Sequence, residues 1–295
     1  FQNLLPLLSI CFILRENIAA MLEPKKSIYF IFDVACSAFV HYSQFMQTSL
    51  TFALDNRLPE IHDRLAVLFP LKTTGKSDPL KQLVFVVVSE GAGPAVGLAV
   101  YNRLWTLYPN FGALRDAAVA DLQDLFIGLP HAERKAQALP EILKIIENHH
   151  GSLDLDFLSK MPAEAARRWL SLLPGVNSAM ATAVLTFSGL KKPMIALNQE
   201  AARTVRRLGL CEEGAPLSAL PRQVAERAPA QWRGTHFAQF SEGMQQVARR
   251  HCVDGAPKCG GCPLKDLCPS GERAAAKVIP FSRYQSAQKK MRSAS

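Results

Sequence analysis

Four of the seven cysteines in this sequence could hold a metal centre through their thiolates. Cys252, Cys259, Cys262 and Cys268 follow one another with the spacing C-x6-C-x2-C-x5-C. Thiolates are soft ligands that suit zinc and iron-sulfur clusters. The glycines and prolines between these cysteines allow the sharp turns that bring four sulfur atoms to one place. The loop is therefore predicted to bind metal.

The spacing also distinguishes between the two kinds of centre. Structural zinc sites usually pair two C-x2-4-C units across a longer spacer, whereas this loop has one C-x2-C with wider flanks. We therefore expect a [4Fe-4S] cluster, with zinc as the alternative. Because four cysteine ligands leave such a cluster no open position, its expected role is to fix the loop geometry.

Composition and charge indicate a globular protein with a polyanionic partner. The 295 residues are 48% hydrophobic and 20% charged, and the formal net charge is +9. Each Lys or Arg placed against a phosphate releases a counterion, so this charge favours nucleic acid. Seven cysteines with four in one loop do not resemble the disulfide framework of a small secreted protein. The other three, Cys11, Cys36 and Cys211, are predicted to be small buried side chains.

The elements that must position this loop are mainly helices. Apolar residues at helical spacing predict helices over 58–68, 92–107, 114–126, 132–148, 163–172, 178–188, 199–208, 217–226 and 237–251. Segment 84–88 is ambiguous, because its residues favour a strand but its continuous apolarity also suits a buried helix. No alternation of strands and helices appears.

Together with the segment LPGVNSAMATAVL at 173–185, the cysteine loop resembles endonuclease III and its helix-hairpin-helix DNA glycosylase family. The resemblance covers about residues 51–270. It implies an all-α fold with two lobes: a six-helix barrel over 72–188 that contains the hairpin, and a cluster lobe formed by 51–71 and 189–270. It also implies that 84–88 is helical and that damaged double-stranded DNA binds between the lobes.

The resemblance assigns DNA contacts to the hairpin and to the cysteine loop. These residues are Leu173, Pro174, Gly175, Val176, Asn177 and Lys258. Glycine allows a close backbone approach, and the amides at the start of the following helix face a phosphate. Asn177 replaces the second hairpin glycine of the family, and we expect it to tolerate a left-handed backbone.

Three positions depart from the family pattern. Ala179 stands where the family has the lysine that attacks the sugar C1′, and Asn198 stands where it has an aspartate. Gly91 replaces a glutamine that fills the gap left by the extruded base. Without an amine at 179, Schiff-base lyase chemistry from this position is excluded. We expect Asn198 or Glu200 to orient a water molecule, although Glu200 has the alternative role of a first-turn acid favoured by the helix dipole.

The sequence thus predicts a DNA-binding protein of the base-excision-repair type. At most it is a monofunctional DNA glycosylase that hydrolyses the N-glycosidic bond of a uracil-like base or an oxidised pyrimidine, without abasic-site lyase activity. The alternatives are a noncatalytic lesion-binding or structural iron-sulfur DNA protein, and a redox protein unconnected with DNA. We expect a cytoplasmic, nucleoid-associated monomer. Residues 1–50 are expected to be an N-terminal extension that is not necessarily native, and 271–295 a basic disordered tail.

Overall fold

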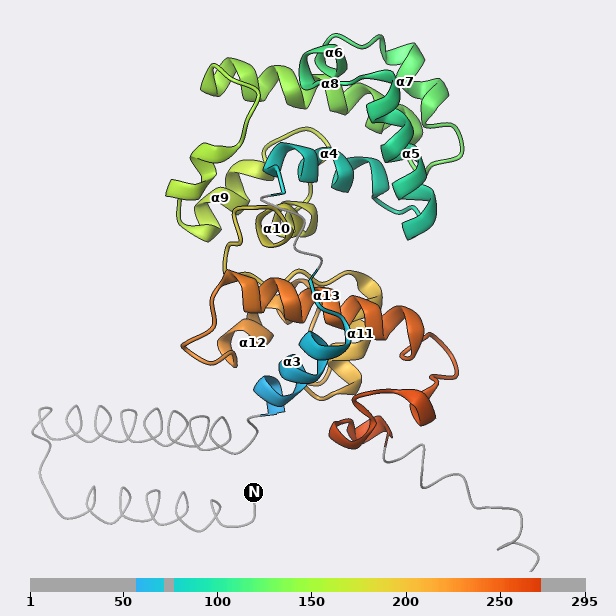
Figure 1. Cartoon of the computed structure of the whole chain (residues 1–295), viewed down its shortest axis with the longest axis vertical. Coiled ribbons are helices and arrows are strands. Elements are labelled where there is room, and N and C mark those ends of the chain that lie inside the picture. Colours follow the sequence, from blue (N-terminus) through green and yellow to red (C-terminus); the bar gives the residue numbers. More distant parts are fainter. Residues whose placement is uncertain (1–56, 72–76, 272–295) are drawn as a thin grey trace, which may run out of the picture. The chain divides into compact units, whose positions relative to one another are not determined.

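All regular structure that the computed structural model describes is helical. It describes residues 57–71 and 77–271, and no strand occurs in these ranges (Figure 1). The all-α fold class implied by the resemblance is confirmed. The predicted extension over 1–50, with Cys11 and Cys36, lies outside the described residues, as does the predicted tail after 271. In the part of the chain described, none of the helices combines the length and apolarity needed to cross a bilayer.

One buried cluster joins the first described helix to the last ones. It is built by α3 (Arg57–Leu68), α11 (Gln199–Arg207), α12 (Leu220–Glu226) and α13 (Gly234–Arg250). Helix α13 packs against both α3 and α11, and its Phe240 and Met244 are fully buried. The cysteine loop follows α13 directly, so these buried apolar side chains support the helix from which the loop begins.

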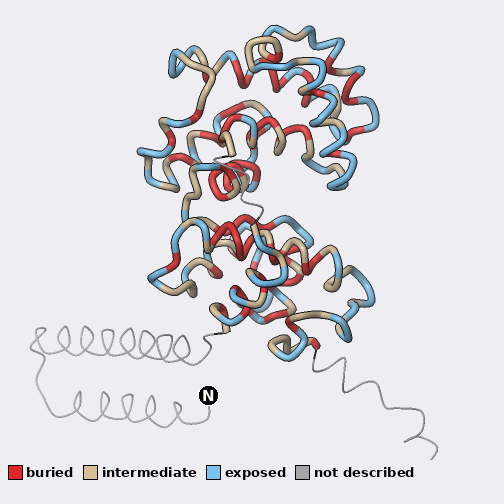
Figure 2. The backbone as a smooth tube through the Cα atoms, viewed as in Figure 1, coloured by how far each residue is buried: buried red, intermediate tan, exposed pale blue. Residues whose placement is uncertain are grey.

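A second buried cluster is built by the helices between these segments (Figure 2). Its helices are α4 (Pro79–Ser89), α5 (Pro94–Leu107), α6 (Phe111–Arg115), α7 (Val119–Leu125), α8 (Ala132–His150), α9 (Ala163–Leu170) and α10 (Ser178–Phe187). Helix α4 contacts α5, α8 and α10.

The ambiguous apolar segment 84–88 is helical and belongs to α4. Asp78 starts this helix by accepting hydrogen bonds from the backbone amides of Leu80 and Lys81, and Pro79 occupies its first turn. Because α4 has neighbours on several sides, its apolar residues need not alternate with polar ones. Burial on several sides therefore explains a sequence that propensity alone assigns to a strand.

The helix predicted over 114–126 is two helices, α6 and α7. Between them Ala118 has an extended backbone, with φ −66° and ψ 134°. Arg115 holds the junction, because its guanidinium binds the carboxylates of Asp116 and, from α8, Glu147. The break arises from this tertiary contact, since the sequence has no glycine or proline there.

Candidate functional site

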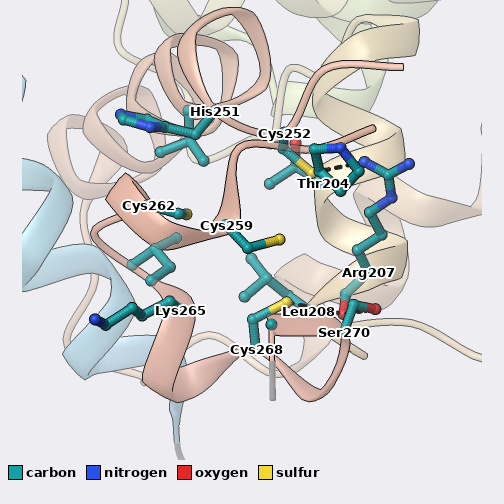
Figure 3. A pocket seen from close by; sticks show the side chains of 14 residues that line it. Thr204, Arg207, Leu208, His251, Cys252, Cys259, Cys262, Lys265, Cys268 and Ser270 are labelled. Atoms are coloured by element: carbon teal, nitrogen blue, oxygen red, sulfur yellow. Dashed lines mark hydrogen bonds between the residues drawn. The ribbon is translucent and has the colours of Figure 1, made fainter. Parts of the chain in front are cut away.

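The four cysteines lie together at the end of α13. Cys252, Cys259, Cys262 and Cys268 all line one cavity (Figure 3), and each is partly buried. Arg207 of α11 lines the same cavity, and its Nη1 donates hydrogen bonds to Cys252 Sγ at 3.4 Å and to the Val253 carbonyl at 2.9 Å.

The chemistry of these four side chains fits a soft metal centre. Burial raises the pKa of the Cys262 thiol, and the other three thiols raise it further through electrostatic repulsion. A positively charged metal centre shared by the thiolates relieves both effects. As the side chains stand, no group of three or more His, Cys, Asp or Glu in the described residues is arranged to hold a metal ion.

Helix α3 fixes the cysteine loop from outside. Arg57 Nη1 donates to the Leu267 carbonyl at 2.8 Å, and the Arg64 guanidinium binds the Asp266 carboxylate at 2.7 and 2.8 Å. Lys258 is exposed on the loop. The loop is thus held to a helix that lies more than two hundred residues earlier in the chain. Its one predicted DNA-contacting lysine faces solvent.

The hairpin between α9 and α10 presents backbone more than side chains. Gly175 has φ +72°, a left-handed conformation that favours glycine. Leu173 and Val176 are buried, Pro174 is partly buried, and Gly175 and Asn177 are exposed. Of the five predicted contact residues in this hairpin, only Gly175 and Asn177 are therefore exposed.

Asn177 does not adopt the left-handed backbone that asparagine was expected to tolerate at this position. Its φ is −86° and its ψ 169°, and its side chain caps α10 by accepting a hydrogen bond from the Met180 amide at 2.9 Å. One cation missed in the sequence lies beside this cap. Arg167 of α9 donates a hydrogen bond to the hydroxyl of Ser178, the first residue of α10.

The predicted catalytic positions meet in a cleft of about 790 Å³. Ala179 of α10, Asn198 and Glu200 all line it, as does Gly91 in the turn after α4. The described structure therefore brings together residues that lie up to about a hundred positions apart in the sequence.

The capping role of Asn198 limits its chemistry. Its Oδ1 accepts a hydrogen bond from the Ala201 amide at 2.8 Å and so starts α11. The remaining amide N–H groups can donate to a water molecule but cannot accept its proton. Glu200, exposed in the first turn of α11, carries a carboxylate that can.

The nearby lysines do not supply the missing amine to the cleft. Lys191 Nζ donates to the Phe187 carbonyl at 3.1 Å, and Lys192 Nζ donates to the carbonyls of Ser159 and Met161 at 2.8 and 2.6 Å. Neither lysine lines the cleft. Burial lowers the pKa of the Lys191 ammonium, but this group is engaged with the end of α10.

Several residues that line the cleft belong to no motif recognisable in the sequence. Phe85 of α4, Glu90 of the turn after it, Phe187 of α10 and Gln245 of α13 also line the cleft. Of these residues, only Glu90 could be found from the sequence, because it directly precedes Gly91, the glycine that replaces the family glutamine.

Two curated relatives each match about two thirds of the chain. Endonuclease III of Bacillus subtilis (strain 168) is 26% identical over 199 residues, which cover 67% of this chain and 84% of that protein. Thymine-DNA glycosylase of Aeropyrum pernix is 26% identical over 200 residues, which cover 65% of this chain and 82% of that protein. No protein-family profile matches.

The fold is also that of solved structures. A trapped covalent intermediate of endonuclease III with DNA has a TM-score of 0.61 and 22% identity, and the match covers 74% of this chain and 97% of that one. With its helical fold and these two relatives, the chain belongs to the endonuclease III-like helix-hairpin-helix DNA glycosylase family.

Proposed function

We propose that this protein is a base-excision-repair DNA glycosylase that hydrolyses the N-glycosidic bond and does not cleave the strand through a Schiff base. The observation that carries the proposal is the lining of the cleft. It contains Ala179, Asn198 and Glu200, and none of its described lining residues is a lysine. A carboxylate and an amide can direct water, but no amine is present to attack the sugar.

In the proposed reaction a water molecule attacks C1′ of the damaged nucleotide. Asn198 donates an amide hydrogen bond that orients this water, and the Glu200 carboxylate accepts its proton. The bond from C1′ to the base nitrogen breaks, which leaves an abasic site and the free base. No covalent intermediate with the protein forms.

The proposed partner is damaged double-stranded DNA, bound by a monomer at the nucleoid. The exposure of residues Gly175 and Asn177 supports a phosphate site at the hairpin, which backbone amides would form. Arg167, whose guanidinium also binds the Glu164 carboxylate, lies beside the start of α10. Lys258 adds a cation on the cysteine loop.

We further propose that Cys252, Cys259, Cys262 and Cys268 bind a [4Fe-4S] cluster that holds the loop in shape. Their place around one cavity supports this assignment. The two buried clusters of apolar side chains support a barrel lobe over 72–188 and a cluster lobe formed by 51–71 and 189–270.

The test measures base release and strand breaks separately. The full chain is incubated with duplexes that carry uracil, thymine glycol, an oxidised purine, an alkylated purine or an abasic site. We expect release of at least one base, no strand break, and no complex trapped by borohydride. Glu200→Gln should slow release on the order of a hundredfold, whereas Glu213→Gln, an exposed carboxylate outside the cleft, should not.

A borohydride-trapped complex with the unaltered protein would contradict the absence of Schiff-base chemistry. One observation favours a second candidate, a noncatalytic lesion-binding protein: the oxygen of Asn198 is engaged in capping α11. Retained binding to damaged duplexes, with no base released from any of them, would select that candidate.

A further inference from the structure

The charged groups in the cleft have one sign. Two carboxylates, Glu90 and Glu200, line it together with the side-chain amides of Asn177, Asn198, Gln199 and Gln245. Among the described lining residues there is no Lys, Arg or His. In a groove that must receive a DNA strand, negative charge is unfavourable unless the ligand brings a positive charge of its own.

The two carboxylates reach the cleft from different elements. Glu90 ends α4, and Glu200 lies in the first turn of α11. Both residues are exposed. Within the described residues, neither carboxylate forms a salt bridge or a hydrogen bond. Lys135 attracts Glu90 electrostatically, but its ammonium is bonded to the main-chain oxygens of Val88 and Glu90 and does not line the cleft.

Two aromatic side chains also favour a positively charged ligand in the cleft. Phe85 of α4 and Phe187 of α10 line the cleft, and each is only partly buried. The face of a phenyl ring is electron-rich and attracts a cation that stacks on it. A flat, positively charged base therefore fits the aromatic and the acidic parts of the lining together.

We propose that the base selected by this cleft is a purine carrying a positive charge through N-alkylation at N3 or N7. The inference rests on the proposed glycosylase function and names its substrate class. It differs from the uracil-like or oxidised pyrimidine expected from the sequence, because those bases depart with negative charge and two carboxylates oppose that charge.

The way in which an N-alkylated purine leaves the sugar fits the residues that differ from the family pattern. When the C1′–N bond of an N-alkylated purine breaks, the bonding electron pair moves to the ring nitrogen and cancels the positive charge, so the base leaves as a neutral molecule. Water then supplies the oxygen bonded to C1′, and its proton passes to Glu200. Such a leaving group needs neither a lysine nucleophile nor a general acid, which accords with Ala179 and Asn198.

The test separates recognition from hydrolysis. Release is measured under single-turnover conditions from matched duplexes that carry N7-methylguanine, N3-methyladenine, uracil or thymine glycol. Binding is measured with a duplex that holds 2′-fluoro N7-methylguanosine, whose glycosidic bond resists hydrolysis, and with the same duplex carrying unmodified guanine. The variants are Glu90→Gln and Glu200→Gln, with Glu213→Gln as the matched control and circular dichroism as the check of folding.

We expect alkylated purines to be released at least tenfold faster than either pyrimidine, and the methylated duplex to bind about tenfold more tightly than the guanine duplex. Glu90→Gln should remove most of that binding preference, and Glu213→Gln should leave it unchanged. Release of uracil or thymine glycol in preference to alkylated purines overturns this inference while the glycosylase function stands. A binding preference without any base release overturns the glycosylase function and supports recognition of a cationic base. If the methylated duplex is not preferred and no base is released, both this inference and the glycosylase function are overturned.

Discussion

At the scale of single residues, the reaction that we propose for the cleft depends on Ala179 and Asn198. Ala179 is the second residue of α10, is exposed and lines the cleft. Asn198 has an extended backbone, with φ −83° and ψ 174°, and caps α11. Lysine has room at the first position, and aspartate caps a helix about as well as asparagine. The two positions therefore accept the family residues without a change of backbone.

We predict that Ala179→Lys combined with Asn198→Asp restores strand cleavage at abasic sites. The new amine can attack C1′ from the cleft wall, and the new carboxylate stabilises the positive charge that develops on the sugar. Borohydride should then trap a covalent complex with abasic DNA. Ala179→Met with Asn198→Asp supplies similar bulk without an amine and should trap none. A folded double variant that binds abasic DNA but is never trapped would show that residue 179 does not reach the sugar.

At the scale of elements, Lys135 of α8 holds the end of α4 and the turn that enters the cleft. It is 6% exposed, and its Nζ donates to the carbonyls of Val88 and Glu90 at 2.9 and 2.6 Å. A helix end carries unsatisfied carbonyl groups, and a cation that bonds to them also suits the helix dipole. The position of Glu90 in the cleft thus depends on a lysine from another helix.

Replacing Lys135 by methionine should lower the free energy of unfolding by about 2 to 4 kcal/mol, because two carbonyl groups lose a charged donor. Burial lowers the pKa of Lys135 from its usual 10.5, and Glu90 opposes this shift. Between the folded-state pKa and about 10.5 the unfolded chain binds more protons than the folded one. The stability of the unaltered protein relative to Lys135→Met should therefore rise with pH in that window. Urea unfolding of both proteins across alkaline pH measures the loss of stability and its pH dependence. A stability difference between them that falls as pH rises would contradict the lowered pKa of Lys135.

Which helices form could be predicted largely from the sequence, but their interruptions and contacts could not. Apolar spacing predicted α3, α5, α8 and α13 within a few residues of their observed bounds. It missed the division of 114–126, because the ion pair of Arg115 with Glu147 is a tertiary contact that local pattern does not encode. The helical state of 84–88 followed only from the family resemblance, since burial of α4 on several sides removes the periodicity that identifies a surface helix.

Close approaches between elements are equally invisible in the sequence. At Gly234, the first residue of α13, an added Cβ would lie 1.5 Å from the carbonyl oxygen of Lys191. Because this neighbour is main chain, no side-chain rotation can relieve the clash. The start of α13 and the segment after α10 are therefore packed backbone against backbone.

Gly234→Ala should lower the free energy of unfolding by about 3 kcal/mol, a cost typical of severe overpacking. Gly243→Ala should cost less, because its added Cβ meets Leu65 Cβ at 2.7 Å rather than 1.5 Å, so that a small displacement of α3 can accommodate it. Gly260→Ala is the control, since nothing lies within 4 Å of its added Cβ. Urea denaturation of the three variants gives the order. A Gly234→Ala variant as stable as Gly260→Ala would show that α13 starts farther from Lys191.

At the scale of the whole molecule, the candidate site was only partly predictable. The motif positions Ala179, Asn198 and Glu200 could be found because each lies next to a recognisable motif, and all three line the cleft. Phe85 and Gln245 could not be found, because they belong to helices 160 residues apart in the sequence that only the tertiary fold brings to one wall. The sign of the charge in the cleft is likewise a property of the folded molecule, since the chain as a whole carries +9.

The cysteine loop links the chemistry of single side chains to the stability of the whole molecule. It contacts α11 through Arg207 and α3 through Arg57 and Arg64. A metal centre bound by the folded loop and not by the unfolded chain adds its binding free energy to the stability of this part of the protein. Loss of the centre should therefore weaken the loop first, and with it the DNA contact that we propose for Lys258.

We predict that the protein purified without oxygen contains about four iron atoms and four sulfides per chain, with the broad visible absorption of a [4Fe-4S] cluster. Cys262→Ser should remove the absorption and lower the melting temperature by several degrees. Cys211→Ser is the matched control, because Cys211 is a partly buried free thiol that does not line the cavity. DNA affinity should fall in Cys262→Ser and in Lys258→Ala but not in Cys211→Ser. One zinc ion per chain and no visible absorption would instead identify a tetrahedral zinc site, and a Cys262→Ser variant with full iron content would remove this thiolate from the set of ligands.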